Sequence, residues 1–136
     1  MAHNFEYFAP TKVYFGRGTE KNTGRYIREY GAKHVMLVYG GSSAKRSGLL
    51  DLIKQSLRDE RIAFSELGGV VPNPRLDKVY EGIHLGKTDG TDFLLAIGGG
   101  SAIDTAKTIA YCLGGPELDV WELYEHTRKA QKCLPV

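Results

Sequence analysis

The chain has 136 residues, of which 42% are hydrophobic and 25% are charged, and its formal net charge is +2. This length is typical of one domain with a hydrophobic core of its own. The small charge and the scattered basic residues argue against a nucleic-acid partner, and no apolar stretch reaches the ~18 residues of a membrane span.

The apolar pattern predicts strands and helices that alternate along the chain. Two apolar runs, Val35–Tyr39 and Phe93–Ile97, are each closed by glycines, which is typical of strands buried on both faces of a parallel sheet. The predicted elements are a strand at 12–15, a helix at 19–30, a strand at 35–39, a helix at 47–58, a weaker strand within 63–71, a helix beginning at 73–74, a strand at 93–97, a helix at 101–113, an irregular segment at 117–131 and the start of a strand at 132–136.

This alternation predicts an α/β fold with a Rossmann-like parallel sheet and helices on both faces. The strands at 35–39 and 93–97 should be neighbours or near neighbours in that sheet. We assign residues 1–136 to one α/β domain. Because residues 132–136 look like the beginning of another strand, we expect the domain to be incomplete.

Three consecutive glycines, Gly98, Gly99 and Gly100, follow the second apolar run and precede Ser101. Glycines at a strand's end let the backbone turn sharply and approach a ligand without a Cβ in the way. Ser101 can cap the next helix, whose N-terminal N–H groups and partial positive charge suit a pyrophosphate. The motif therefore predicts a dinucleotide site, with a tight turn that binds nothing as the alternative.

A second polar loop, made of Gly40, Gly41, Ser42 and Ser43, follows the first apolar run. NAD-preferring dinucleotide folds commonly place a carboxylate near such a loop to accept from the ribose 2′-OH. No carboxylate occurs between residues 35 and 48. The two serines and the basic pair Lys45 and Arg46 can instead donate to a 2′-phosphate. The loop favours NADP(H) over NAD(H), although a solvated loop with incidental charges would have the same composition.

A third feature is the break Pro72-Asn73-Pro74. Asn73 is a good helix N-cap and Pro74 a good first helical residue. The simplest interpretation is therefore a helix entry turn. The Asn73 side chain can in addition bind the adenine or ribose side of a cofactor.

The segments VYFGRG, LVYGGSS, PNPR and GGGSAIDTAK occur in this order, and the chain from Phe5 to Val136 resembles the iron-containing alcohol dehydrogenases. It is most similar to their butanol dehydrogenase-like, NAD(P)H-dependent branch. The resemblance implies an N-terminal dinucleotide-binding domain and a helical domain, absent here, with one Asp and three His for iron or zinc. It also implies a homodimer that acts on a primary alcohol or an aldehyde such as butanol or butanal.

The same resemblance assigns roles to single residues. Gly98 to Ser101 would contact the pyrophosphate, and Asp104 would lie near the nicotinamide. Asn73 would lie near the adenosine, and Gly40 to Ser43 around the ribose.

The sequence contains no apparent set of metal ligands and no catalytic residues. Glu122 and His126 have i,i+4 spacing, but their segment lacks a helical core face and the further ligands of a catalytic site. We interpret Asp104 and Lys107 as a helix ion pair rather than as an acid–base pair. Since a metal would supply the Lewis acid, we expect these 136 residues to have no alcohol dehydrogenase activity.

Two other functions stay open at this point. One is a nucleotide-binding module without catalysis, and the other is a lyase-type relative of dehydroquinate synthase that uses NAD transiently. Ser101 and the DTAK ending of the glycine motif count against the lyase. No secretory signal is visible, and Cys112 and Cys133 have neither metal-type nor CxxC spacing, so we expect a protein of the reducing cytoplasm.

Overall fold

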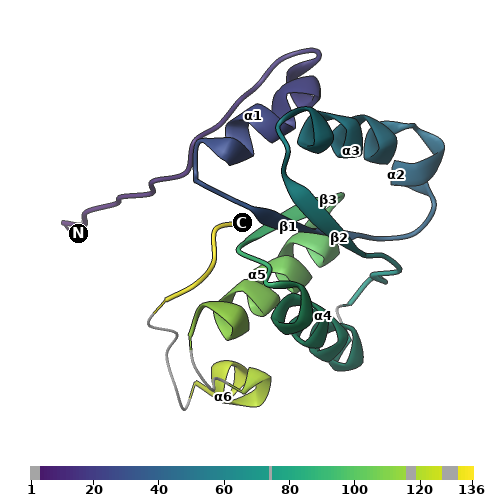
Figure 1. Ribbon diagram of the computed structural model, residues 1–136. Helices are drawn as coiled ribbons and strands as arrows, with labels where there is room; N and C mark the ends of the chain where they lie inside the picture. Colours follow the sequence, from purple (N-terminus) through teal and green to yellow (C-terminus); the bar gives the residue numbers. More distant parts are fainter. Residues whose placement is uncertain (1–3, 74, 116–118, 127–131) are drawn as a thin grey trace.

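The computed structural model describes residues 4–73, 75–115, 119–126 and 132–136. Its centre is a parallel sheet in the order β2-β1-β3 (Figure 1). The strands are β1 (His34–Tyr39), β2 (Ala63–Leu67) and β3 (Phe93–Ile97). Val35 of β1 is paired with Phe93 of β3, and the register continues to Tyr39 and Ile97. The prediction that these two apolar runs are neighbouring parallel strands is therefore confirmed.

Helices cover both faces of this sheet, which confirms the predicted α/β class (Figure 1). The helices α1, α2 and α3 lie above the sheet in Figure 1, and α4 and α5 lie below it. The helical elements are η1 (Thr19–Asn22), α1 (Thr23–Arg28), α2 (Ser43–Arg46), α3 (Leu49–Asp59), α4 (Leu76–Asp89), α5 (Gly100–Gly114) and α6 (Val120–Tyr124). Within the described ranges, no helix is both long and apolar enough to cross a membrane.

The core consists of two apolar layers that share the central strand β1. Val35, Leu37 and Tyr39 point into the layer under α1, α2 and α3. Met36 and Val38 point into the layer under α4 and α5. Successive side chains of a strand point to opposite faces, so an uninterrupted apolar run fits only a strand that is covered on both sides.

β3 is less completely covered than the sequence predicts. Leu95 and Ala96 are only partly buried, and among the described residues β3 has a strand neighbour on one side alone. On its other side the Leu94 N–H donates to the carbonyl of Pro135 at 3.0 Å. The predicted beginning of a strand at 132–136 is thus not a strand, but it lies along the edge of β3.

The strand predicted at 12–15 is wrong, because the segment has no regular structure. Val13 and Phe15 are 77% and 99% exposed, so their alternation does not reflect a buried face. The segment is held by side chains instead. Tyr14 stacks on Tyr26 of α1 with 3.6 Å between ring centroids, and the Lys12 ammonium lies 2.7 Å from the Glu29 carboxylate.

Several of the predicted elements have different bounds in the structure. The helix at 19–30 is a 3-10 turn followed by α1, which ends at Arg28. The helix at 47–58 is preceded by the separate helix α2, because Gly48 at φ +77° interrupts the path between them. β2 (Ala63–Leu67) lies within the range 63–71 in which a weaker strand was predicted.

The segment predicted to be irregular at 117–131 contains the short helix α6. Asp119 and Glu122 form a reciprocal capping box at its beginning, and Val120 is fully buried. A single buried residue in one turn produces no helical periodicity, which explains why the pattern missed it. The rest of that prediction, at 117–118 and 127–131, lies outside the described residues.

Candidate functional site

The two glycine-rich loops meet at one edge of the sheet. Because β1 and β3 are parallel neighbours, their carboxyl ends lie side by side, where open α/β sheets bind ligands. Gly40 and Ser43 from the first loop and Gly98 to Ser101 from the second line a common hollow of about 240 Å³. The remaining lining residues are Ala44, Val70, Pro72, Ile97 and Ala102.

The second loop turns directly from β3 into α5. Gly98 has φ +136°, a conformation that residues with a Cβ rarely adopt. A Cβ at Gly99 or Gly100 would meet no atom within 4 Å, so the space above the helix start is open. The first N–H groups of a helix have no partner within it and suit an anion. The turn therefore has the form of a phosphate cradle.

Ser101 does not cap α5, contrary to the sequence prediction. The N-cap is Gly99, in an extended conformation and without a side-chain hydrogen bond. Ser101 lies one residue inside the helix, where its carbonyl accepts from the Thr105 hydroxyl at 2.8 Å. Ser101 nevertheless lines the hollow beside the glycines.

Only half of the predicted ribose loop reaches the hollow. Gly40 and Ser43 line it, whereas Gly41 and Ser42 do not and are exposed. Ser42 is the N-cap residue of α2, and Ser43 is its first residue. The basic residues Lys45 and Arg46 therefore lie on a helix rather than on a loop, and Ala44 of the same helix packs into the core.

Asn73 lies outside the hollow and does not cap α4. The N-cap is Arg75, in an extended conformation, while Asn73 is exposed with φ +61°. Asn tolerates this left-handed region better than most residues, so it serves the turn rather than the helix. Its neighbour Pro72 lines the hollow instead. The prediction for Pro74 lies outside the described residues.

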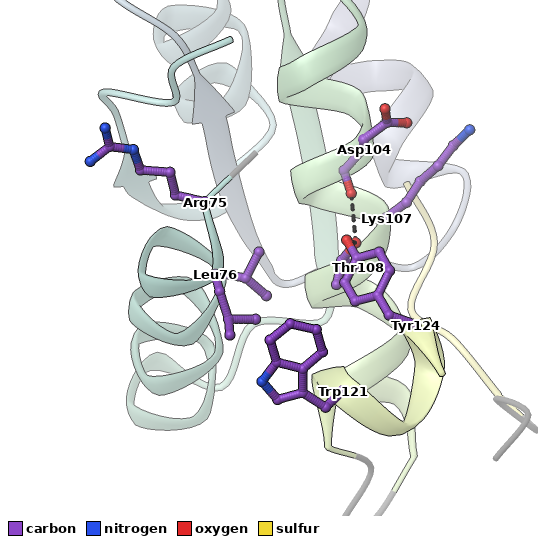
Figure 2. Close-up of a pocket in the computed structure, with 8 residues that line it drawn as sticks. Arg75, Leu76, Asp104, Lys107, Thr108, Trp121 and Tyr124 are labelled. Carbon is purple, nitrogen blue, oxygen red and sulfur yellow. Dashed lines mark hydrogen bonds between the residues drawn. The ribbon is translucent and has the colours of Figure 1, made fainter. Parts of the chain in front are cut away.

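Asp104 lines a different and larger hollow, of about 570 Å³, between α4, α5 and α6 (Figure 2). Trp121 and Tyr124 of α6 close its lower end in Figure 2. No ion pair joins Asp104 to Lys107, so the expected helix pair is not formed. The Asp104 carbonyl instead accepts from the Thr108 hydroxyl at 2.9 Å.

A polar cluster beside the first loop was missed by the sequence analysis. The Tyr39 hydroxyl donates to Glu66 Oε1 at 2.9 Å, and Lys54 Nζ lies 2.9 Å from Glu66 Oε2. Burial raises the pKa of Glu66, but the hydrogen bonds from Lys54 and Tyr39 outweigh it and bring the pKa below its usual value. Burial and then the Glu66 hydrogen bond raise the pKa of Tyr39 to about 12.

This cluster could have been found only from the register of β2 with β1, because no sequence motif marks it. Glu66 is separated by 27 residues from Tyr39 and lies in the weakest of the predicted strands. Once β2 is placed beside β1, Val38 pairs with Leu67, and Glu66 falls next to the end of β1.

The described residues do not fit a catalytic metal. Among them, no three side chains of His, Cys, Asp or Glu are grouped so as to hold an ion. Glu122 belongs to the α6 capping box, and His126 is exposed beyond the helix with φ +56°. The ligands that the resemblance implies for iron or zinc, one Asp and three His, are not grouped among the described residues.

The parallel sheet, with helices on both faces and glycine-rich turns at adjacent strand ends, is that of a Rossmann-like α/β domain. Residues 10–136 match the family model described as iron-containing alcohol dehydrogenase. The chain therefore belongs to this family. The match leaves the lyase alternative without support.

Relatives with both types of cofactor are found. The chain is 44% identical over 136 residues to NADH-dependent butanol dehydrogenase A of Clostridium acetobutylicum, covering 98% of this chain and 34% of the relative. It is 34% identical to the NADPH-dependent aldehyde reductase YqhD of Escherichia coli, covering 90% of this chain and 31% of the relative.

A solved structure has a similar fold. The crystal structure of NADH-dependent butanol dehydrogenase A from Thermotoga maritima superimposes with a TM-score of 0.92 at 37% identity, over 97% of this chain and 33% of that one. The chain thus spans about a third of the length of the relatives that it matches.

Proposed function

We propose that this chain is the NAD(P)-binding domain of a metal-dependent alcohol dehydrogenase or aldehyde reductase. The whole protein would transfer a hydride between nicotinamide and a primary alcohol or aldehyde such as butanol or butanal. The observation that carries the proposal is the hollow shared by Gly40, Ser43 and the Gly98–Ser101 turn. Membership of the alcohol dehydrogenase family supports the chemistry.

In this proposal the cofactor's pyrophosphate binds at the beginning of α5. The N–H groups of the first turn donate to it, and the positive end of the helix dipole favours its charge. Gly40 and Ser43 then lie on the ribose side, together with Gly41 and Ser42 at the rim. The hollow of about 240 Å³ holds only part of a dinucleotide. Asp104 and Asn73, which lie outside it, would bind the two ends.

We further propose a preference for NADP(H) over NAD(H). The absence of a carboxylate between residues 35 and 48, together with exposed Lys45 and Arg46, supports it. The name of the Escherichia coli relative supports it too, whereas the Clostridium relative is named NADH-dependent. The effect of Lys45 and Arg46 on a 2′-phosphate depends on the other charges around α2.

We also propose that the whole protein is a homodimer of the cytoplasm. Large exposed apolar side chains at the N-terminal segment support association, among them Phe5 at 89% and Phe8 at 83% exposure. Cys112 and Cys133 are free, which supports a reducing compartment.

The metal-supported chemistry needs ligands that the described residues do not offer, so we expect this chain alone to turn over no butanal with added iron or zinc.

The binding proposal is tested by titrating ADP-ribose, NADH and NADPH into the ¹⁵N-labelled chain and following the amide shifts. Gly99→Val puts a side chain into the open space at the cradle without a strained backbone, since Gly99 is extended. We expect at least about tenfold weaker binding, because the charge-assisted contacts to the pyrophosphate are lost. Gly115→Val, also at an extended position with space around it, is the matched control.

Shifts that avoid residues 40–43 and 98–101, or equal affinity of the Gly99→Val and wild-type chains, would contradict the proposal.

A further inference from the structure

The strand next to the ribose loop brings a carboxylate to a place where the loop itself has none. Glu66 of β2 accepts from the hydroxyl of Tyr39, which directly precedes Gly40. The loops after the two strands are joined by backbone hydrogen bonds, from Gly69 N–H to the Gly40 carbonyl and from Val70 N–H to the Tyr39 carbonyl. The position of Glu66 relative to the loop is therefore fixed.

Two lysines act on this carboxylate, Lys54 through an ion pair and Lys45 from a greater distance. Lys54 of α3 lies 2.9 Å from Glu66 Oε2. Because its side chain is only 17% exposed, Lys54 stays in this ion pair. Lys45 of α2 lies over the Tyr39 ring, with its Nζ 5.5 Å from the ring centroid. Lys45 also acts electrostatically on Glu66. Its ammonium is thus attracted toward the ring and the carboxylate.

The Tyr39 ring cannot move away from this arrangement. It is 4% exposed and lies against the backbone of Gly68, where a Cβ would come within 2.8 Å of the ring. A residue with a side chain at 68 would displace it. The ring therefore forms a fixed platform under Lys45, and its hydroxyl is the link to Glu66.

We propose that Glu66 is a specificity-determining residue that limits the affinity for a 2′-phosphorylated cofactor by holding Lys45 over Tyr39. The inference rests on the proposed cofactor site. A 2′-phosphate on a ribose at the Gly40–Ser43 loop has to compete with Glu66 for the Lys45 ammonium. A 2′-hydroxyl carries no charge, so Glu66 leaves its binding unchanged. Glu66 acts through Lys45 and is a positioning residue.

The test measures the dissociation constants of 2′,5′-ADP and 5′-AMP by amide-shift titration of the whole chain. For Glu66→Gln, whose side-chain oxygen still accepts from Tyr39, we expect about three- to tenfold tighter binding of 2′,5′-ADP and a change below about twofold for 5′-AMP, as for one partly screened charge. The difference between the effects of Glu66→Gln on the two dissociation constants should decrease as the salt concentration is raised. Glu60→Gln, which removes a carboxylate paired with Arg28 at 2.7 Å elsewhere on the surface, should leave the ratio of the two constants unchanged.

A double-mutant cycle separates the action through Lys45 from a general effect of charge. In a Lys45→Gln background, Glu66→Gln should change the 2′,5′-ADP constant by less than about twofold. An unchanged ratio in Glu66→Gln, or an equal gain for both probes, overturns the inference while the cofactor site stands. A full gain without Lys45 overturns the positioning role. If neither probe binds the wild-type chain at the loop, the proposed cofactor site fails and the inference with it.

Discussion

The backbone N–H of Gly24 in α1 donates to the hydroxyl of Ser56 in α3 at 3.0 Å, and this hydroxyl in turn donates to the carbonyl of Lys21 at 2.8 Å. Ser56 is buried, so Ser56→Ala leaves a buried donor and an acceptor without partners. We expect a loss of about 1–3 kcal/mol in the free energy of unfolding by urea. Ser42→Ala, at an exposed cap without a side-chain hydrogen bond, should change it by less than about 0.5 kcal/mol. Equal effects of the two variants would contradict the role of Ser56.

Gly82 permits the close approach of α4 to α5. A Cβ at this position would overlap Cδ1 of Ile109. Helix propensity alone makes Gly82→Ala stabilising by about 1 kcal/mol, but overpacking costs about 1–3 kcal/mol. We therefore expect net destabilisation in chemical unfolding. Ile109→Val removes Cδ1, so the double variant should recover part of the loss, and simple additivity would refute this packing argument.

Tyr39 makes the stability depend on alkaline pH. Its pKa is raised from 10.0 to about 12 in the folded chain, so the unfolded chain loses this proton first as the pH rises. The contribution of Tyr39 to the free energy of unfolding is complete below about pH 10 and is lost as the pH rises toward 12. Between about pH 10 and pH 12, the free energy of unfolding should fall more steeply for the wild-type chain than for Tyr39→Phe. The difference in slope should reach up to about 1.4 kcal/mol per pH unit. Tyr7→Phe, at a position 82% exposed, is the control; the same slope for all three chains would rule out the Tyr39 effect.

The two thiols should differ in reactivity. Cys133 is exposed, whereas Cys112 is buried in α5, and burial raises the pKa of the Cys112 thiol. Because the thiolate is the reactive form, we expect one fast equivalent and one at least about a hundredfold slower with a disulfide reagent at neutral pH. Cys133→Ser should abolish the fast phase, and denaturant should make both thiols fast. A fast phase that survives Cys133→Ser would show that α5 opens.

The central part of the fold could be predicted from the sequence because burial leaves a strong pattern there. The runs 35–39 and 93–97 are apolar at every position, and only strands covered on both faces fit such runs. Both glycine loops follow from these strand ends. The parallel pairing of these two strands brings the two loops to one hollow.

The remaining features depend on tertiary contacts that leave no periodic signal. α2 and α6 have four and five residues, and each inserts a single buried residue. Asn73 looks like a cap, but the backbone uses its tolerance of positive φ. Glu66 becomes part of the cluster only through the register of β2 with β1, which the alternation of polar and apolar residues does not determine.

The sheet order also has a consequence during synthesis on the ribosome. The middle strand, β1, is made first, and its two partners follow it in the chain. The last residue of β3 is Ile97, 58 residues after Tyr39. At about 5–20 residues per second, the five apolar residues of β1 wait about 3–12 s for their second neighbour. Throughout that interval the nascent chain carries an unprotected edge, so chaperone capture is most needed between the emergence of residues 39 and 97.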